Sequence, residues 1–364
     1  DYMGAHGALI LGHADERVVA AISKAASKGS GFGAPSEIEV RLTELIVSRF
    51  PTIDMLRLVN TPAEALTGVV ALARSHTGRS GIVTFDGCWH SYVGSVSAQA
   101  ADGGTAESSP AVPYNSVEVI EELFRNRGSG IAAVIVEPVA ASIGLIPPAD
   151  GFLAFLRSLC DDHNVLLVFD ETLTGFRLTP GGADAFYGVR PDLTLLGPII
   201  GGGLPLAAYG GCKEVMKHAD RNTGMPRTSP AAGNLLGMAA GLATLQAVGE
   251  SGFYEALEAQ SARLDEGLRA AAAAACVPTC HTRVASMLGM FFGEITVTDS
   301  ASASRCDTAL FAHYHRAMLD RGVFLPPSPL SPLFVSAAHS NDEIDRTIEA
   351  AHDALRIAGE SSRR

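Results

Sequence analysis

The sequence predicts an α/β protein in which a mainly parallel sheet is flanked by helices, with a smaller C-terminal α+β domain. Three observations support this prediction. Helical patterns alternate with short β-rich runs, which is typical of parallel strands joined by helices. The runs at 82–85, 132–136 and 165–169 show little polar alternation, as expected for strands buried on both faces. The 364 residues are enough for one large core and a second, smaller one.

Helix signals mark the segments around these strands. Ser36 and Glu39 form a capping-box pattern at the start of an apolar-periodic stretch, which predicts a helix beginning there. A long helical stretch is expected from about Asn234 to Cys276, leading into the C-terminal part of the chain.

The C-terminal part is expected to combine helices with a few strands. The expected strands lie near residues 286–293 and 323–325, and the expected helices near residues 307–321 and 341–357. The sequence therefore predicts a large domain over residues 12–250 and a small domain over residues 251–364. Residues 1–11 are expected to pack on the small domain.

Two of the predicted strands end in a carboxylate. Glu137 follows the strand at 132–136, and Asp170 follows the strand at 165–169. Open α/β sheets bind ligands outside the carboxyl ends of their strands. Both acids are therefore expected at a binding site.

Charge and hydropathy exclude some classes of function. The formal net charge is -12 and no block of basic residues occurs, so binding to nucleic acids or anionic membranes is not expected. No run of about 18 apolar residues is present, so no transmembrane span is predicted. The first residues lack the charged-then-apolar layout of a signal peptide. Six scattered cysteines in a chain of this length indicate a reduced, cytoplasmic protein.

One short cluster, Cys276-x-x-x-Cys280-His281, has the residue types of a metal site. Structural zinc sites need a second pair of ligands at usable spacing, and none accompanies this cluster. Ordinary packing of the two cysteines explains the pattern better. The sequence therefore predicts no metal site.

Lysine is rare in this chain and occurs only at positions 24, 28, 213 and 217. The first two lie in a predicted surface helix, and the other two lie on a short amphipathic segment after Gly210 and Gly211. Neither place resembles a binding pocket. No lysine amine is therefore expected at the carboxyl ends of the strands.

Two stretches near the middle of the chain carry a family resemblance. Residues 169–177 read FDETLTGFR, and residues 196–205 read LGPIIGGGLP. They resemble the core of the class III aminotransferases, most nearly the glutamate-1-semialdehyde 2,1-aminomutase subfamily. The resemblance extends from Leu11 to Ser340. It implies the PLP-dependent-transferase fold type I (PLP is pyridoxal phosphate), a small-molecule substrate, and a homodimer with its pocket at the subunit interface.

The position that holds the cofactor in that family departs from the pattern here. The family has a lysine between Gly197 and Ile199, and this chain has Pro198. A lysine amine forms a Schiff base with PLP, whereas proline has no side-chain nucleophile. The sequence therefore predicts that PLP binding is lost and that the protein uses no cofactor.

The phosphate cradle of the family, a Ser-Gly-Thr turn at a helix N-terminus, is also changed. The matching turn is Thr61-Pro62-Ala63, in which proline removes an N–H donor and alanine removes a hydroxyl. Pro62 is at the same time a favoured residue for the first turn of a helix. A pocket with fewer phosphate contacts is expected to prefer a ligand that is less anionic than PLP.

Ring recognition is the part of the family site that is retained. By the resemblance, Asp170 matches the aspartate that pairs with the pyridine nitrogen, and Trp89 matches the aromatic residue that stacks on the ring. The alternatives are a core tryptophan and a strand-end cap. We favour the pocket because both positions lie where such sheets bind ligands. His90, beside the stacking position, and Glu137 are further candidates at the same rim.

Other family positions have lost charged or hydroxylated groups. By the resemblance, Pro230 replaces a threonine supplied by the partner subunit, Ser331 replaces a glutamate, and Ser142 replaces an asparagine or an equivalent group. Ser229 or Thr228 is expected to be still able to reach a ligand. His6 lies in a segment that reads Ser-Trp-Gly-Pro in the family. The candidate pocket is completed by Thr61 and Pro198.

Three hypotheses for the function remain open. The first is a PLP-independent enzyme of a biosynthetic pathway, in which Asp170 and His90 perform acid–base chemistry on a small metabolite, such as isomerisation, cyclisation, elimination or condensation. The second is a non-catalytic protein that binds a metabolite or a partner. The third is an aminomutase or aminotransferase that holds PLP or pyridoxamine phosphate noncovalently. Glu171 and Arg177 are weaker candidates, because packing and turn formation also explain them.

Overall fold

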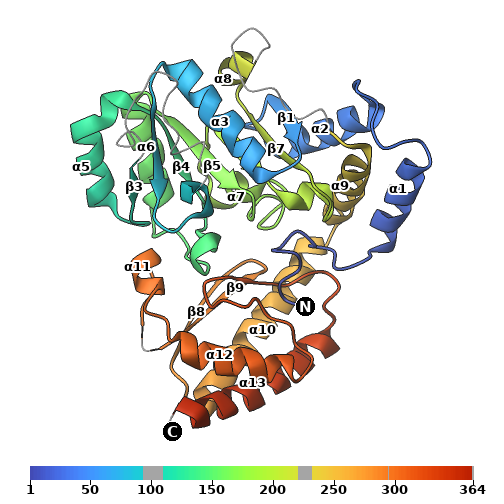
Figure 1. Ribbon diagram of the computed structural model, residues 1–364, viewed down its shortest axis with the longest axis vertical. Coiled ribbons are helices and arrows are strands. Elements are labelled where there is room, and N and C mark those ends of the chain that lie inside the picture. The colour runs from blue at the N-terminus through green and yellow to red at the C-terminus, as the bar shows by residue number, and fades with distance from the viewer. Residues whose placement is uncertain (93–109, 220–231, 294, 363–364) are drawn as a thin grey trace. The chain divides into compact units, whose positions relative to one another are not determined.

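The computed structural model describes residues 1–92, 110–219, 232–293 and 295–362 (Figure 1). The chain forms two compact units, here called the sheet unit and the C-terminal unit. The sheet unit comprises residues 14–138 and 148–249, and the C-terminal unit comprises residues 1–13, 139–147 and 250–364. Residues 1–13 thus belong to the same unit as the C-terminal part of the chain. Residues 139–147 belong to the C-terminal unit, and the chain returns to the sheet unit at residue 148.

A seven-stranded sheet forms the centre of the sheet unit (Figure 1). Its strands are β1 (Met55–Val59), β2 (Gly81–Phe85), β3 (Ala111–Val112), β4 (Ile131–Val136), β5 (Leu166–Glu171), β6 (Leu193–Leu196) and β7 (Ala207–Gly211). Their spatial order is β1-β7-β6-β5-β4-β2-β3. Strands β6, β5, β4, β2 and β3 are parallel, and β7 is antiparallel to both of its neighbours. The predicted α/β class is confirmed, as are the three predicted strands, which correspond to β2, β4 and β5.

Helices connect and cover this sheet. They are α1 (Glu16–Ala26), α2 (Glu37–Arg49), α3 (Pro62–Thr77), α5 (Val117–Arg127), α6 (Phe152–His163), α7 (Gly182–Tyr187), α8 (Lys213–Met216) and α9 (Leu235–Val248). Helix α3 packs against β1, β4, β6 and β7 through a buried aliphatic face that includes Leu66, Val69 and Leu72. At the start of α2, the hydroxyl of Ser36 accepts a hydrogen bond from the Glu39 N–H at 3.3 Å, as the capping pattern predicts.

The long helical stretch expected from Asn234 to Cys276 is two helices. Helix α9 ends at Val248, and α10 begins at Phe253 and ends at Ala275. The residue before α10, Gly252, has φ +83°, a left-handed conformation that glycine adopts without a steric penalty. Because a left-handed residue interrupts a right-handed helix, the chain ends one helix and starts another here.

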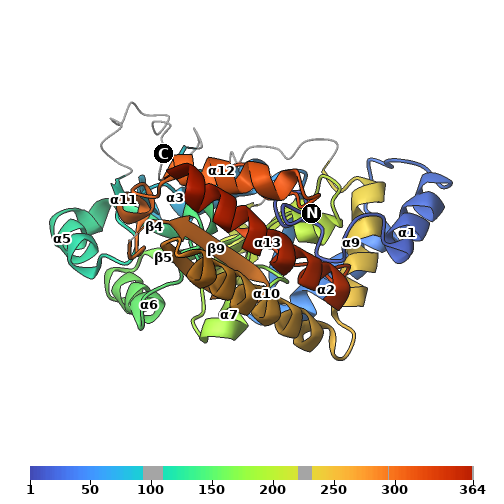
Figure 2. The same cartoon turned by 90° about the horizontal axis from the view of Figure 1, so that it is seen from below.

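A three-stranded antiparallel sheet lies in the C-terminal unit, in the order β10-β9-β8. Besides α10, the elements are β8 (Thr279–Val284), β9 (Met287–Phe292), α11 (Ser300–Ala303), α12 (Thr308–Leu319), β10 (Leu333–Phe334) and α13 (Asn341–Ser362). Helices α10 and α13 lie side by side, and α12 packs against α13 (Figure 2). Within the described residues, no helix combines the length and the apolar character that a membrane span requires.

The strand expected near residues 323–325 is wrong, because this segment is irregular. Its backbone carbonyls bond to groups outside any sheet: Phe324 O accepts from the Tyr2 N–H at 2.9 Å, and the His315 side chain lies 3.1 Å from Leu325 O. Pro326 and Pro327 follow directly, and neither has an N–H to give to a strand ladder. An apolar run beside prolines is therefore a weak strand signal.

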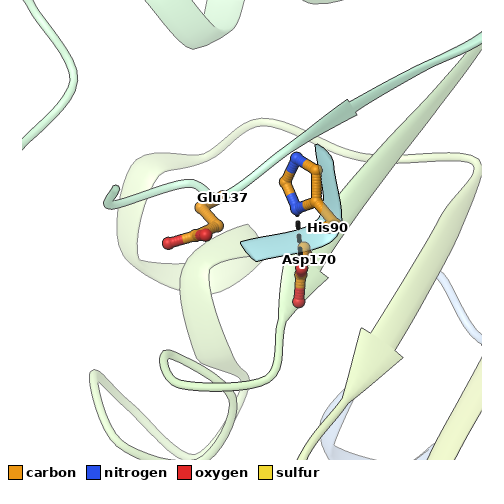
Figure 3. Close-up of side chains that lie close together, drawn as sticks. All are labelled: His90, Glu137 and Asp170. Atoms are coloured by element: carbon orange, nitrogen blue, oxygen red, sulfur yellow. Dashed lines mark hydrogen bonds and ion pairs between the residues drawn. The ribbon is translucent and has the colours of Figure 1, made fainter. Parts of the chain in front are cut away.

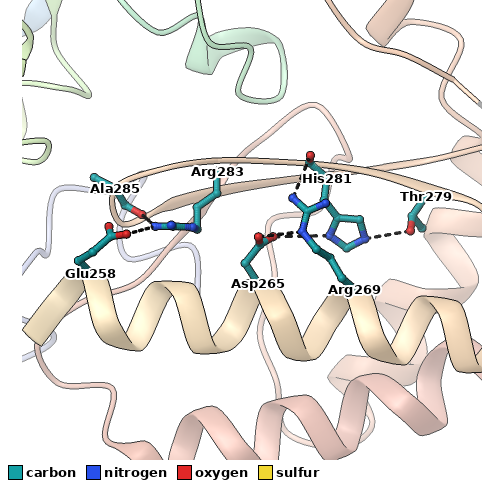
Figure 4. Close-up of polar contacts among 7 residues, drawn as sticks. All are labelled: Glu258, Asp265, Arg269, Thr279, His281, Arg283 and Ala285. Atoms are coloured by element: carbon teal, nitrogen blue, oxygen red, sulfur yellow. Dashed lines mark hydrogen bonds and ion pairs between the residues drawn. The ribbon is translucent and has the colours of Figure 1, made fainter. Parts of the chain in front are cut away.

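A set of polar contacts joins helix α10 to strand β8 (Figure 4). Arg269 donates to the Asp265 carboxylate at 2.8 Å and to His281 O at 3.1 Å, and Arg283 donates to Glu258 at 2.6 Å. Burial lowers the pKa of His281 to about 4, with Arg269 acting in the same direction. His281 is therefore neutral at neutral pH, and this part of the predicted cysteine–histidine cluster serves as a structural contact.

The ends of β5 and β6 approach each other closely where the sequence carries Pro198. The register pairs Glu171 with Leu196. A methyl group placed on Gly197, the residue directly after β6, would overlap the backbone of Thr172 just after β5. Only glycine leaves room for this approach, which fixes the start of the short 3-10 helix η5 (Pro198–Gly201) beside the end of β5.

Gly197→Ala should lower the free energy of unfolding by about 1–3 kcal/mol, since the added methyl group meets backbone that is held in the sheet. Gly130→Ala is the matched control, because a methyl group there has no heavy atom within 4 Å. Urea unfolding of both variants measures the difference. Equal stability of the two variants would contradict the tight packing of β5 against β6.

Candidate functional site

Three side chains that are far apart in the sequence meet at the carboxyl ends of neighbouring strands. His90 lies in the 3-10 helix η1 (Trp89–Tyr92) that follows β2, Glu137 follows β4, and Asp170 lies near the end of β5. Because β2, β4 and β5 are adjacent and parallel, their ends bring the three residues together (Figure 3). One nitrogen or oxygen atom from each lies within 4.8 Å of the others. We call this group the acid–histidine cluster.

The Asp170 carboxylate is held by the chain itself. Its Oδ2 lies 2.9 Å from His90 Nδ1. Its Oδ1 accepts from the Thr172 N–H at 3.1 Å and from the Thr172 hydroxyl at 2.7 Å. Among the described residues, its only ion-pair partner is His90. These contacts fix the orientation of the carboxylate and partly offset the free-energy cost of burying it.

The second ring nitrogen of His90 has no partner in the part of the chain that the structure describes. Nε2 is buried and has no hydrogen-bond partner among the described residues. In Figure 3 this nitrogen points away from Asp170. A buried polar atom without a partner is rare in native proteins, and a catalytic role or an ion is among the usual reasons. His90 is therefore the member of the cluster with an open position.

The remaining carboxylate, that of Glu137, is linked to a thiol. Cys88 forms a side-chain hydrogen bond with Glu137. Burial raises the pKa of the Cys88 thiol well above its usual value, and the nearby charges of Glu137 and Asp170 act in the same direction. The Tyr114 hydroxyl donates to Glu137 O at 3.0 Å and so fixes the turn after β4. Cys88 therefore lies at the edge of the acid–histidine cluster.

Glu171, the residue after Asp170, has a separate set of contacts. Its carboxylate accepts from the Ala183 N–H at 2.7 Å and from the Thr174 hydroxyl at 3.2 Å. Gly182 lies so close that any side chain there would collide with this carboxylate. Burial raises the pKa of Glu171 to about 8, although the hydrogen bonds oppose the shift. These contacts support the packing and turn interpretation of this residue.

The predicted phosphate cradle at the start of α3 has few free donors. The Thr61 hydroxyl accepts from the Glu64 N–H at 3.2 Å, and the Glu64 carboxylate accepts from the Asn60 N–H at 2.8 Å. The Ala65 N–H donates to Thr61 O at 3.1 Å, and Pro62 has no N–H. A carboxylate thus takes a donor at the end of the helix where an anion would bind. Compared with the family pattern, this turn therefore offers a phosphate fewer donors.

The position of Pro198 offers no amine to a cofactor. Pro198 is half-buried and begins η5, directly after β6. All lysines of the chain, at positions 24, 28, 213 and 217, are exposed. No lysine therefore lies among the buried groups at the strand ends. The residues present do not fit a covalently attached PLP.

The other predicted pocket residues lie in different places. Trp89 is half-buried, packs against the core of the sheet unit, and has its ring 6.2 Å from that of His90. Since β1 is parallel to β6, Thr61 and Pro198 follow strand ends at the same edge of the sheet as the acid–histidine cluster. The remaining residues, His6, Ser142 and Ser331, belong to the C-terminal unit, and Ser229 lies outside the described residues.

Two contributors to the site were missed by the sequence analysis. Sequence reasoning does not single out Cys88 among the scattered cysteines, and it does not single out Thr172. A signal existed for Thr172, because a hydroxyl two residues after an aspartate can bond back to its carboxylate. No local pattern pointed to Cys88, since its partner Glu137 comes from another strand.

Changing Glu171 to Gln should make stability less dependent on pH. In the wild type the folded pKa of about 8 exceeds the ordinary value of 4.5, so the folded chain binds more protons between these limits. The stabilising contribution of this group is complete below pH 4.5 and is lost as the pH rises to about 8. Urea unfolding at several pH values across this window measures the slope. An unchanged slope in E171Q would contradict the assignment.

The fold and the strand-end site define an α/β protein of the aminotransferase architecture. The family described as aminotransferase class-III matches residues 1–355. The chain belongs to the class III aminotransferase family. Two similar relatives are glutamate-1-semialdehyde 2,1-aminomutases, from Desulforudis audaxviator and Thermomicrobium roseum. Each is 45% identical, and the similarity covers 98% of this chain and 86% of the relative.

Solved structures agree with the fold. An omega-transaminase from Sphaerobacter thermophilus superposes with a TM-score of 0.90 at 29% identity, covering 98% of this chain and 86% of that chain. A glutamate-1-semialdehyde aminomutase from Pseudomonas aeruginosa PAO1 superposes with a TM-score of 0.88 at 25% identity, covering 98% and 83%. The predicted fold type I architecture is therefore confirmed.

Proposed function

We propose that this chain is a PLP-independent relative of glutamate-1-semialdehyde aminomutase that performs acid–base chemistry on a small metabolite. The observation that carries the proposal is Pro198, which stands where the family resemblance places the cofactor's lysine. No other lysine replaces it, because all four are exposed. Without an amine at the site, the covalent step of a conventional aminotransferase has no nucleophile.

The start of α3 supports a ligand less anionic than PLP. Three backbone N–H groups there bond to atoms of the chain, and Pro62 supplies none. The carboxylate of Glu64 adds negative charge at the helix N-terminus. A phosphate would have to displace these contacts, so a neutral or weakly charged metabolite fits better.

Asp170 and His90 are the proposed acid–base pair. Asp170 holds the ring of His90 through Nδ1, as the aspartate of a catalytic triad holds its histidine, and leaves Nε2 for proton exchange. Both side chains are enclosed, so a ligand reaches them only when neighbouring side chains move aside. Trp89 is proposed to stack on the ligand. Further ligand contacts remain predictions from the resemblance, at Thr61, Glu137, Ser142, Pro198, Ser229, Ser331 and His6.

A second candidate function, noncovalent use of pyridoxamine phosphate, is favoured by one comparison. A Pseudomonas aeruginosa aminomutase variant in which a lysine is replaced by alanine is described as a complex with pyridoxamine phosphate. Its structure superposes with a TM-score of 0.87 at 25% identity. Loss of a lysine in a relative is thus compatible with holding the amine form of the cofactor. The engaged donors at the start of α3 weigh against this in the present chain.

The proposed assembly is a homodimer that binds a small molecule. This proposal rests on the family resemblance, in which the partner subunit completes the pocket. The alternative of a non-catalytic binding protein also keeps a pocket and a dimer. It differs in one respect: Asp170→Asn should then leave the function intact, whereas it should abolish turnover by an enzyme that needs Asp170 to orient His90.

Treatment of the wild type with PLP and then borohydride should give no stoichiometric adduct at a single site, since all four lysines are exposed and none lies at the strand ends. Intact-mass spectrometry measures the adduct. Pro198→Lys should gain one adduct per chain, and Pro198→Ala, which removes the ring without adding an amine, should gain none. Pyridoxal and PLP should label P198K to a similar extent, because the cradle donors are engaged.

Two outcomes would count against this account. A stoichiometric wild-type adduct at one lysine would restore conventional PLP chemistry and end the proposal. Much faster labelling of P198K by PLP than by pyridoxal would show that the start of α3 still binds phosphate. In that case the preference for a less anionic ligand would be wrong.

A further inference from the structure

The acid–histidine cluster is enclosed within one unit. The exposed fractions are 0% for His90, 3% for Glu137 and 1% for Asp170. All three residues belong to the sheet unit, so their meeting depends only on the ends of β2, β4 and β5. A partner that stays with these side chains while they remain enclosed must be small, such as an ion.

The charge of the cluster calls for a positive partner. It contains two carboxylates, and burying a carboxylate is expensive unless the group is paired or coordinates a metal. Among the described residues, Asp170 forms no ion pair with any lysine or arginine. Its histidine partner is neutral in its metal-binding form. When both carboxylates are ionised, they and a neutral imidazole match the charge of one divalent cation.

The donor atoms suit a transition-metal ion. Imidazole nitrogen favours zinc, copper, iron and nickel, and carboxylate oxygen is a common ligand of zinc. His90 Nδ1 and Asp170 Oδ2 lie 2.9 Å apart, close to the separation of about 3.3 Å between two ligands of one tetrahedral zinc ion. One ring nitrogen of His90 and one carboxylate oxygen each of Glu137 and Asp170 lie within 4.8 Å of one another, so Glu137 is near enough to serve as a third ligand.

We propose that the acid–histidine cluster is a binding site for one divalent transition-metal ion of the zinc class. The ion replaces the proton between His90 Nδ1 and Asp170 Oδ2 and takes Glu137 as its third ligand. Three protein ligands leave a coordination position open. Cys88, which is hydrogen-bonded to Glu137, lies beside the ligand set and orients its carboxylate.

This inference goes beyond the proposed function and shares its residues. With the metal bound, the acid–base group would be a metal-bound water, whose pKa such ions lower strongly. Metal binding can be measured without a substrate and without PLP. A protein that binds no metal would leave the loss of PLP chemistry untouched, and a PLP adduct would leave the metal site untouched.

The test is metal content and affinity of the full-length chain. Protein stripped with a chelator and exposed to Zn²⁺ or Co²⁺, followed by desalting, should retain one ion per chain by elemental analysis. The midpoint of thermal unfolding should rise with the metal concentration, as expected for a ligand that binds the folded state. Failure of the folded wild type to retain either ion would overturn the proposal.

Variants assign the ion to this cluster. Glu137→Gln and His90→Asn should each weaken Zn²⁺ binding by at least about 10-fold in calorimetric titrations. Glu171→Gln is the matched control. Glu171 is a buried carboxyl of β5, as Asp170 is, but it faces α7 rather than the cluster. Cys280→Ser controls for the other cysteine–histidine pair, and both controls should bind as the wild type does. Unweakened binding in folded E137Q and H90N would overturn the assignment.

Discussion

The contact between His90 and Asp170 is the interaction on which the site depends. It joins the segment after β2 to β5 across the intervening strand β4, and it lies entirely within the buried interior. Thr172 completes it by donating two hydrogen bonds to the other oxygen of Asp170. The carboxylate is therefore oriented by the chain before any ligand binds. A ligand that binds at this site must either keep the hydrogen bonds of Asp170 or replace them.

Pro198 and the start of α3 both affect which ligands the site can hold. Pro198 offers no nucleophile at the end of β6. Pro62 has no N–H at the start of α3, where the Glu64 carboxylate accepts from the Asn60 N–H. Both prolines suit the fold, because Pro198 begins a 3-10 helix and Pro62 begins an α-helix, both places where proline fits well.

Sequence patterns predicted the features that depend on residues close together in the chain. The buried strands β2, β4 and β5 were recognisable from unbroken apolar runs, and the acids at their ends followed from the rule that such sheets bind ligands there. The approach of His90 to Asp170 was not predictable, since it depends on how a 3-10 helix turns after β2. The Cys88 contact with Glu137 was missed for the same reason. The strand prediction at residues 323–325 was wrong because apolar character alone does not show which groups the backbone hydrogen bonds join.

The most direct test of the central claim is a crystal structure of the protein grown with an excess of pyridoxamine phosphate. In metal-free protein we expect His90 to remain hydrogen-bonded to Asp170 and no phosphate to lie at the start of α3. A pyridine ring stacked on Trp89, with its nitrogen on Asp170 and its phosphate beside Pro62, would contradict it.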